Sequence, residues 1–407
     1  MLDQKPTDSV EDTPQSERMK QIVLFGILTL LTITATAMLH VNQPEFILDR
    51  FVGITEVEYS LFDSVLYLSY FIFGLATGAL SDRWSRRRDF VLVGTIGSII
   101  FYWLMPTALS YPLLLLFRFL QGAFTVMTWQ TLMTMVLDFS GTTNRGKNMG
   151  IFGAFLGLAM GLGPAVGGII ASYGVFVPYY TASMLNVVVF VIAFFTVKDS
   201  KVTKKKPTLK HSLSVVRRHP KLVVPGLFNF VDRLHIGFIL TALPFVLSTV
   251  LGLSESLRGL TLAIFAMPFI VLQYPMGKLS DRIGRFKLLI IGSIGFGLVL
   301  ISIGFIGFQG FSSLLVMLVI LGFFAGMTSA PSMALVGDTT GPEDSAMAMG
   351  FFNFVGNLGI TIGPITFGFL ALVSDFVVAF IVAGLLELIT LAIIIVLIKF
   401  VFKEDLA

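Results

Sequence analysis

Three ionisable residues lie inside or at the edge of long apolar segments, where a charge is costly and needs a partner or a task. Asp63, Arg118 and Glu45 sit at a similar distance from one end of the segments that carry them. Arginine does not give up its proton, so a proton carrier at this depth is a carboxyl group whose pKa a neighbouring arginine shifts. We expect Asp63 to be that site, ahead of Glu45, which could simply reach outside water. The alternative is a static ion pair that holds helices together.

Two of the apolar segments also carry polar side chains at steps of three or four residues, which places each set on one helix face. The first set is Thr29, Thr32, Thr36, His40 and Gln43, and the second is Arg118, Gln121, Thr125 and Trp129. Such faces turn away from lipid. His40 could titrate near neutral pH and is a further proton candidate. The alternative is a histidine that only donates a hydrogen bond.

Another polar group, Asn229, Asp232, Arg233 and His235, lies about ten residues into its segment, roughly 15 Å deep and close to a bilayer centre. Asp232 is the last candidate for proton coupling. Adjacent residues are about 100° apart on a helix. We therefore expect only one of Asp232 and Arg233 to face a cavity, while the other pairs between helices.

Three further positions within the apolar segments are candidates for polar or adaptable contacts with a bound molecule. Met327 lies in a segment rich in phenylalanine and methionine, which adapt to varied apolar partners. Asn353 and Asn357 share one helix face. Glu387 lies in the middle of the last segment, where we expect a contact between helices rather than a part in transport.

Composition assigns the chain of 407 residues to the membrane proteins, because 55% of its residues are apolar, 13% are charged and its mean hydropathy is +0.89. The net charge of +4 arises in short loops, so we expect no nucleic-acid partner. There is no cysteine, and the four histidines are scattered. With no phosphate-binding loop either, the sequence predicts no metal site, no cofactor and no enzyme.

A criterion of about 20 consecutive apolar residues gives twelve membrane spans. They are expected at 22–47, 59–80, 90–109, 113–137, 146–171, 177–197, 222–248, 257–277, 287–308, 312–336, 346–372 and 377–400. The predicted organisation is a disordered tail (1–20), a six-helix half (21–197), a basic linker (198–221), a second six-helix half (222–400) and a short tail (401–407). The linker is expected to be a solvated tether.

The placement of lysine and arginine predicts the orientation in the membrane. With the N-terminus inside, 24 of the 28 lie in cytosolic segments, and only Arg50 and Arg258 lie in outside loops. Because cytosolic loops carry the excess of basic residues, we expect both termini in the cytosol and a multi-pass protein of the plasma membrane.

The two halves repeat one another with an offset of about 200 residues. The stretch Gly78-Ala79-Leu80-Ser81-Asp82-Arg83-Trp84-Ser85-Arg86 returns as Gly277-Lys278-Leu279-Ser280-Asp281-Arg282-Ile283-Gly284-Arg285. Further pairs are Pro44 and Pro244, Asp138 and Asp338, and Gly163-Pro164 and Gly363-Pro364. Two parallel copies of six spans are typical of a transporter whose site lies between the halves near the middle of the membrane.

The repeated stretch resembles the G-x-L-x-D-R-x-G-R loop of the major facilitator superfamily, although Ser85 replaces a glycine in the first copy. Arg118, Gln121 and Gly122 resemble the family's R-x-x-Q-G motif, which is associated with proton coupling. Residues 159–168 resemble the antiporter motif G-x-x-x-G-P-x-x-G-G, with Ala159 in place of the first glycine. The resemblance covers essentially the whole chain after its first 20 residues.

This resemblance implies an all-α membrane fold of twelve helices in two pseudo-symmetric halves, working as a monomer in lipid by alternating access. The resemblance also implies that spans one, four, seven and ten line a central cavity. We expect its wall to include Thr36, Gln43, Gln121, Thr125, Trp129, Asn229, Arg233 and Met327, together with Asn353 and Asn357 of span eleven. A cytosolic latch that favours the outward-open state would include Gly78, Asp82, Arg83, Arg86, Asp138, Gly277, Asp281, Arg282, Arg285 and Asp338. In it, Asp82 and Asp281 would face the N-terminal ends of spans eleven and five, with Arg86 near Asp138 and Arg285 near Asp338. Gly163, Pro164, Gly167, Gly363 and Pro364 would let their helices bend.

The function that we expect is secondary transport, as a proton-coupled antiporter that exports a lipophilic or amphipathic small molecule. One alternative is a proton symporter or uniporter for a sugar or other metabolite, which would need more paired polar groups in its cavity. A sensor or lipid translocator on the same scaffold is the third reading.

Overall fold

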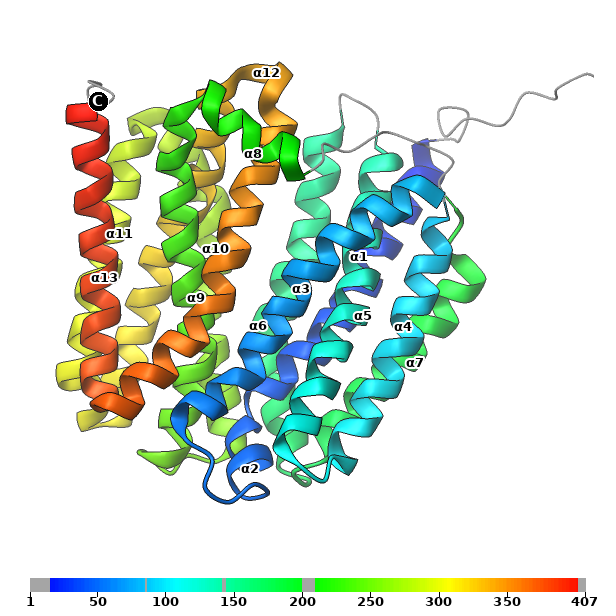
Figure 1. Cartoon of the computed structure of the whole chain (residues 1–407), viewed down its shortest axis with the longest axis vertical. Coiled ribbons are helices and arrows are strands. Elements are labelled where there is room, and N and C mark those ends of the chain that lie inside the picture. The colour runs from blue at the N-terminus through cyan, green and yellow to red at the C-terminus, as the bar shows by residue number, and fades with distance from the viewer. Residues whose placement is uncertain (1–14, 85, 141–143, 200–208, 402–407) are drawn as a thin grey trace, which may run out of the picture.

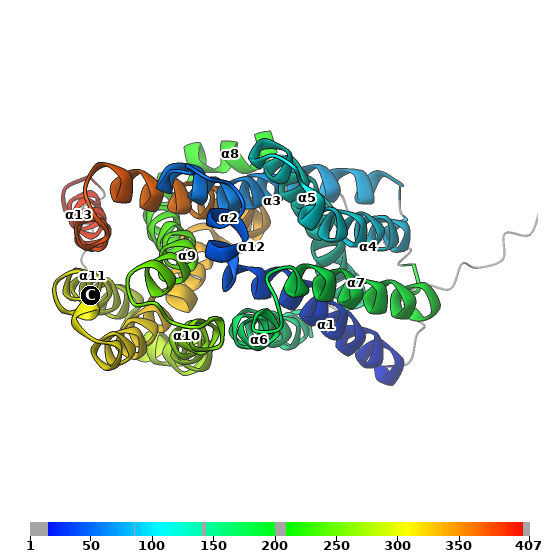
Figure 2. The ribbon, with the colours of Figure 1, turned by 90° about the horizontal axis from the view of Figure 1, so that it is seen from below.

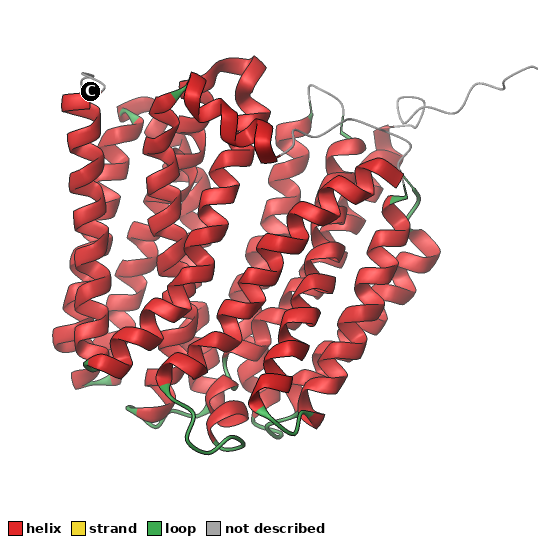
Figure 3. Ribbon diagram, in the orientation of Figure 1, coloured by secondary structure: helices red, strands yellow, loops and turns green. Residues whose placement is uncertain are grey.

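The computed structural model describes residues 15–84, 86–140, 144–199 and 209–401, and within them the chain is helical, with no strand (Figure 3). Twelve helices are long and apolar enough to cross a membrane, as the sequence predicts. The helices are α1 (Gln15–Ala37), α2 (Gln43–Leu48), α3 (Glu56–Trp84), α4 (Arg87–Leu104), α5 (Tyr111–Asp138), α6 (Arg145–Ala171), α7 (Val177–Thr196), α8 (Leu209–Arg218), α9 (Val223–Thr249), α10 (Glu255–Ile283), α11 (Arg285–Ile306), α12 (Phe311–Val373) and α13 (Phe376–Val396).

The helices form two halves, α1–α7 and α9–α13, which lie side by side (Figures 1 and 2). The element α12 holds two spans, Phe311–Thr340 and Met347–Val373, and the chain reverses between them at the top of Figure 1. The end of α13 and the helix α8 lie at this end of the molecule, and α2 lies at the other (Figure 1). We call these two ends the linker face and the α2 face.

The first span differs from the prediction at both ends. Helix α1 begins at Gln15, so the last residues of the predicted tail are helical, and it gives way to a 3₁₀ turn at Met38–His40. Helix α2 then starts afresh with Pro44 in its first turn. Proline is favoured there because it lacks the N–H that a helix interior needs. The break turns His40 and Glu45 toward different partners.

The linker contains a packed helix where we expected a solvated tether. Near the end of α8, Val215 is fully buried in a cluster with Leu222 and residues of α12. Arg218 and His219 pair with Asp344 in the turn of α12, at 3.0 and 2.8 Å. The described part of the linker is therefore fastened to the second half.

Glycines bring the two halves together at the α2 face. A Cβ on Gly168 of α6 would lie 2.4 Å from the carbonyl oxygen of Glu255 on α10, so only glycine permits this approach. Gly368 of α12 has the same relation to the carbonyl oxygen of Glu56 on α3, at 2.5 Å. The two contacts are related by the internal repeat, since the glycines are 200 residues apart and their partners 199.

Candidate functional site: a buried carboxylate and a central cavity

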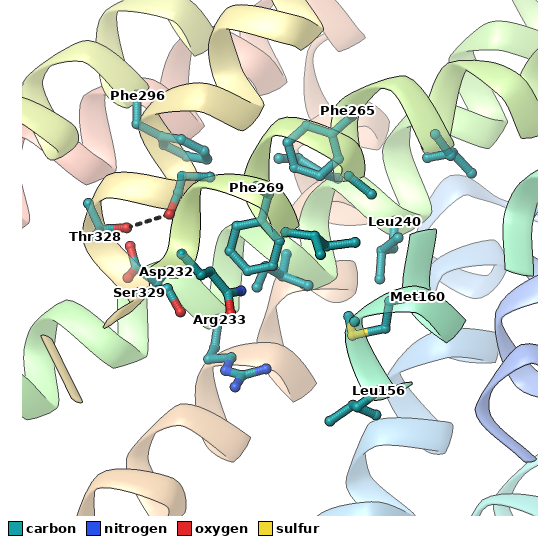
Figure 4. A pocket seen from close by; sticks show the side chains of 18 of the residues that line it. Leu156, Met160, Asp232, Arg233, Leu240, Phe265, Phe269, Phe296, Thr328 and Ser329 are labelled. Atoms are coloured by element: carbon teal, nitrogen blue, oxygen red, sulfur yellow. Dashed lines mark hydrogen bonds between the residues drawn. The ribbon is translucent and has the colours of Figure 1, made fainter. Parts of the chain in front are cut away.

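A cavity of about 280 Å³ lies between α6 of the first half and α9, α10, α11 and α12 of the second. Its wall is mostly apolar, with the rings of Phe265, Phe269 and Phe296 facing Leu156 and Met160 across the space (Figure 4). The polar groups that line it are those of Asn229, Asp232, Arg233, Gln273, Thr328 and Ser329. An apolar space with a few convergent polar groups is typical of a site for a small organic molecule.

Asp232 and Arg233 both line this cavity, which corrects the expectation that only one of them would (Figure 4). Helix α9 contributes several residues to the lining, so the cavity covers a broad sector of this helix and includes adjacent positions. They are Asn229, Asp232, Arg233, Ile236, Ile239 and Leu240. One acidic and one basic group are therefore available to a bound molecule.

Most of the other residues expected on the cavity wall are elsewhere. Thr36 and Gln121 contact the hydroxyl of Tyr102 on α4, at 2.7 and 3.0 Å, and Thr125 contacts Ser98 of the same helix at 3.0 Å. The predicted polar faces of α1 and α5 thus turn toward another helix. The remaining expected residues are outside the lining too: Gln43 and Met327 are buried, Trp129 packs near Tyr70, and Asn353 and Asn357 are exposed.

The Asp63 carboxylate is fully buried and has partners from three directions. His40 Nδ1 lies 3.3 Å from Asp63 Oδ1, and Arg118 Nη2 lies 3.5 Å from the same oxygen. The hydroxyl of Thr241 donates to Asp63 Oδ2 at 2.9 Å. Because Thr241 is on α9, this hydrogen bond joins the first half to the second.

Arg118 is held in place by contacts within the first half. Its Nη1 donates to Gln121 Oε1 at 3.0 Å, and its guanidinium carbon lies 4.4 Å from the centre of the Phe62 ring. Gln121 in turn donates to Tyr102 and Thr125. The arginine is fully buried and always charged, so it provides a fixed positive charge beside Asp63.

Glu45, the second proton candidate, forms an ion pair across the two halves. Its Oε1 lies 2.8 Å from Arg258 Nη2 and accepts the hydroxyl of Ser248 at 2.9 Å. Arg258, which the sequence analysis assigned to an outside loop, is fully buried near the start of α10. A buried charge needs a partner, and Glu45 provides it.

These contacts close the α2 face. Besides the bonds of Glu45 and Asp63, the hydroxyl of Ser256 donates to Gly168 O at 3.3 Å, and Tyr59 packs against Phe245 with ring centres 4.9 Å apart. On the other side, the cavity adjoins a second space that shares Gln273, Ser329 and Met333. This space reaches Ser345 in the turn of α12 and Met349 at the start of its second span. The central cavity therefore continues toward the linker face.

The latch residues are described only in part. Arg87, rather than the expected Arg86, pairs with Asp138, while Arg86 is exposed and lies 3.8 Å from Asp89. Arg285 pairs with both Asp338 and Asp281, the latter at 2.9 Å. The surroundings of Gly78 and the side chains of Asp82 and Arg83 are not among the described parts of the structure. Gly277 lies against Ala330, and Arg282 is exposed.

The residues expected to bend α6 and the second span of α12 serve close packing in the structure. Helix α6 continues through Pro164, and a Cβ on Gly163 or Gly167 would collide with Ala37 or Met38. In the second half, Gly363 lies against the Leu234 carbonyl and Pro364 against Gly237. These small residues let α6 approach the end of α1, and α12 approach α9.

The chain matches the family model of the Major Facilitator Superfamily at residues 25–241 and 226–405. It belongs to this superfamily. The superfamily members similar to it include an uncharacterised transporter of Methanocaldococcus jannaschii, with 25% identity over 79% of this chain and 83% of that protein. The class G tetracycline resistance protein of Vibrio anguillarum is 26% identical over 76% of this chain and 79% of its own length.

Other relatives match in part or in fold. The quinolone resistance protein NorA of Staphylococcus aureus is 34% identical over 45% of this chain and 46% of its own. The solved structure of a bacterial homologue of the human lysosomal transporter Spinster, in an inward-facing and occupied conformation, has a TM-score of 0.78 and 14% identity. That match covers 94% of this chain and 97% of the other. The chain is thus a multi-pass membrane transporter of the major facilitator fold.

The sequence analysis did not identify three residues that contribute to the site: Tyr102, Thr241 and Arg258. Tyr102 and Thr241 stand out in no pattern, because a lone tyrosine or threonine is common in a membrane span. Arg258 gave a signal, since it lies two residues inside the predicted span 257–277 and a charge there needs a partner.

Proposed function

We propose that the protein is a proton-coupled antiporter that exports a lipophilic or amphipathic small molecule. The observation that carries this proposal is the buried Asp63, a carboxylate that lies beside a fixed arginine and accepts a hydrogen bond from the opposite half. Its protonation and the contact between the halves therefore depend on one another. The tetracycline and quinolone resistance proteins among the relatives favour export of an organic molecule.

The Thr241 bond supports one direction of coupling. When the α2 face closes, Thr241 donates to Asp63 Oδ2 while Arg118 and His40 lie against Oδ1, and the carboxylate is shielded from water. When the face opens, the donor leaves with the second half and water reaches the carboxyl group. Asp63 then takes up a proton from the side of the α2 face and releases it after closure, toward the side on which the cavity opens.

The cavity suits a small molecule that is largely apolar. Its volume is near the lower end of the roughly 300–1,000 Å³ range of ligand pockets, and three phenylalanines line it. Asp232 and Arg233 offer one acidic and one basic group, so a molecule with a single polar end can be oriented there. The few polar groups argue against a sugar, which would need many paired hydrogen bonds.

The test is transport by purified protein in vesicles, with and without a pH gradient, across a panel of lipophilic fluorescent compounds. We expect uphill movement of at least one compound that requires the gradient. Transport that is equal without the gradient, or that occurs only for sugars, would overturn the proposal.

The orientation can be tested directly because the chain has no cysteine of its own. We propose that the linker face is cytosolic, as the distribution of lysine and arginine predicts. A cysteine in place of the exposed Arg217 in α8 should then react with an impermeant maleimide only in inverted vesicles. The matched site is the exposed Ser172 at the α2 face, which should react in intact cells. The reverse pattern would show that the protein has the opposite orientation.

The ion pair of Glu45 is expected to hold the α2 face closed. Glu45→Gln keeps the size of the side chain but leaves the buried Arg258 without its nearest counter-charge, with Glu255 remaining at 3.7 Å. We expect the closed state to lose on the order of 1–3 kcal/mol, less than for a fully buried pair because Glu45 is partly exposed.

The readout is the labelling rate of a cysteine placed at Val246, which is buried at this end of α9. The rate should rise in Glu45→Gln. It should rise less when Arg258→Gln is added, because no unpaired charge then remains. Equal rates in all three proteins would show that the pair does not control the face.

A further inference from the structure

A second buried acid–base pair lies in the other half, between α9 and α13. His235 Nδ1 is 3.2 Å from Glu387 Oε2, and the two side chains are 0% and 1% exposed. His235 Nε2 lies 2.9 Å from the carbonyl oxygen of Ala383, also on α13. The pair makes its described contacts within the second half, whereas the contacts around Asp63 come from the first half and Thr241.

The hydrogen-bond partners determine how many protons this pair holds. A carbonyl oxygen can only accept, so Nε2 of His235 must carry its hydrogen. A neutral imidazole of this tautomer would present the Nδ1 lone pair to Glu387. An ionised Glu387 would then place two acceptors against each other, with a net negative charge and both groups buried. One more proton, on Nδ1 or on the carboxyl group, removes the repulsion and makes the pair neutral.

The pair lies directly behind the wall of the central cavity. The ring of Phe296, which lines the cavity, has its centre 5.3 Å from that of His235. Asp232, on the cavity wall, is within electrostatic range of Glu387. The ionisable groups described near the pair are Asp232 and Arg233 from α9 itself, while α11 contributes the Phe296 ring.

We propose that His235 and Glu387 form a second proton-binding site of this transporter, which holds one proton between them and exchanges it through the cavity when Phe296 moves aside. The site belongs to the second half, whereas Asp63 belongs to the first. Each half then has its own buried carboxylate with a histidine 3.2–3.3 Å away, His40 in one case and His235 in the other. The proposal deepens the proton-coupled function by giving the transporter two proton sites.

The test counts the protons bound by the purified protein in detergent, titrated with a pH indicator between about pH 5 and 9, where exposed carboxylates stay ionised. Glu387→Gln should bind one proton fewer over this range than the parent protein. The glutamine amide can donate to His235 Nδ1, so the local hydrogen bonds are retained without an ionisable proton. His235→Gln should lose the same proton, and the double variant should lose no more, since the two residues share it.

The matched control is Glu17→Gln, which removes an exposed carboxylate and should leave the titration unchanged. If Glu387→Gln superimposes on the parent protein, or if the two single losses add, the shared proton site is disproved. The role of Asp63 is tested separately by uphill transport with Asp63→Asn. A titration loss with Glu387→Gln together with a full response of Asp63→Asn to the pH gradient would refute the role of Asp63 and leave the second site standing.

Discussion

Asp63→Asn is expected to abolish export driven by a pH gradient while leaving substrate binding and downhill exchange measurable. Asparagine has the same size and still accepts the hydrogen bond of Thr241, but it cannot bind and release a proton. The movement of the halves is then no longer tied to proton transfer. The measurement is uphill transport of a compound in vesicles at equal and unequal pH, together with its binding to the purified variant.

The matched control is Asp49→Asn, because Asp49 is an exposed carboxylate at the end of α2 on the same face. It should transport like the parent protein under both conditions. If Asp63→Asn keeps its full response to the gradient, the coupling proton is carried elsewhere. The pair of His235 and Glu387 would then be the next site to remove.

The twelve spans could be predicted because length and hydropathy determine whether a helix crosses a membrane. Depth could be predicted in the same way, and it brought Asp63 and Arg118 to one level, where the structure has them 3.5 Å apart. Depth along a helix says nothing about which neighbouring helix faces a residue. The contacts of Thr241 with Asp63 and of Tyr102 with Gln121 could therefore not be predicted.

Periodicity had the same limit for the polar faces of α1 and α5. It indicated correctly that Thr36, Gln121 and Thr125 avoid lipid, and they are buried. It could not tell whether these side chains face a cavity or a tyrosine on α4.

The prediction that Arg86 pairs with Asp138 was wrong because of a local uncertainty, since Arg87 is the partner. Consecutive residues differ by about 100° on a helix, so the answer depends on the residue at which α4 begins, and that boundary is uncertain by one or two residues in any sequence.

Gly168→Val is expected to prevent closure of the α2 face. A Cβ at this position would lie 2.4 Å from the backbone oxygen of Glu255, and ordinary contact begins at 3.4 Å, so α6 and α10 must separate by about 1 Å. Backbone atoms in two packed helices cannot yield as a flexible side chain does. The open state of the α2 face has no such contact, so the substitution biases the equilibrium toward it.

Spin labels on cysteines at Ser172 and Ser254, on either side of the contact between α6 and α10, would show the shift. Their distance should increase in Gly168→Val, and labels at Lys147 and Ile283 on the linker face should come closer together. Gly368→Val, the repeat-related variant, should act in the same direction through the carbonyl of Glu56. Gly150→Val is the control, since it makes the same change in α6 where nothing lies within 4 Å of the new atom. If Gly150→Val changes the distances as much as Gly168→Val does, the effect comes from a bulkier α6 alone. If only Gly168→Val and Gly368→Val change them, close backbone contact at these two glycines closes the α2 face.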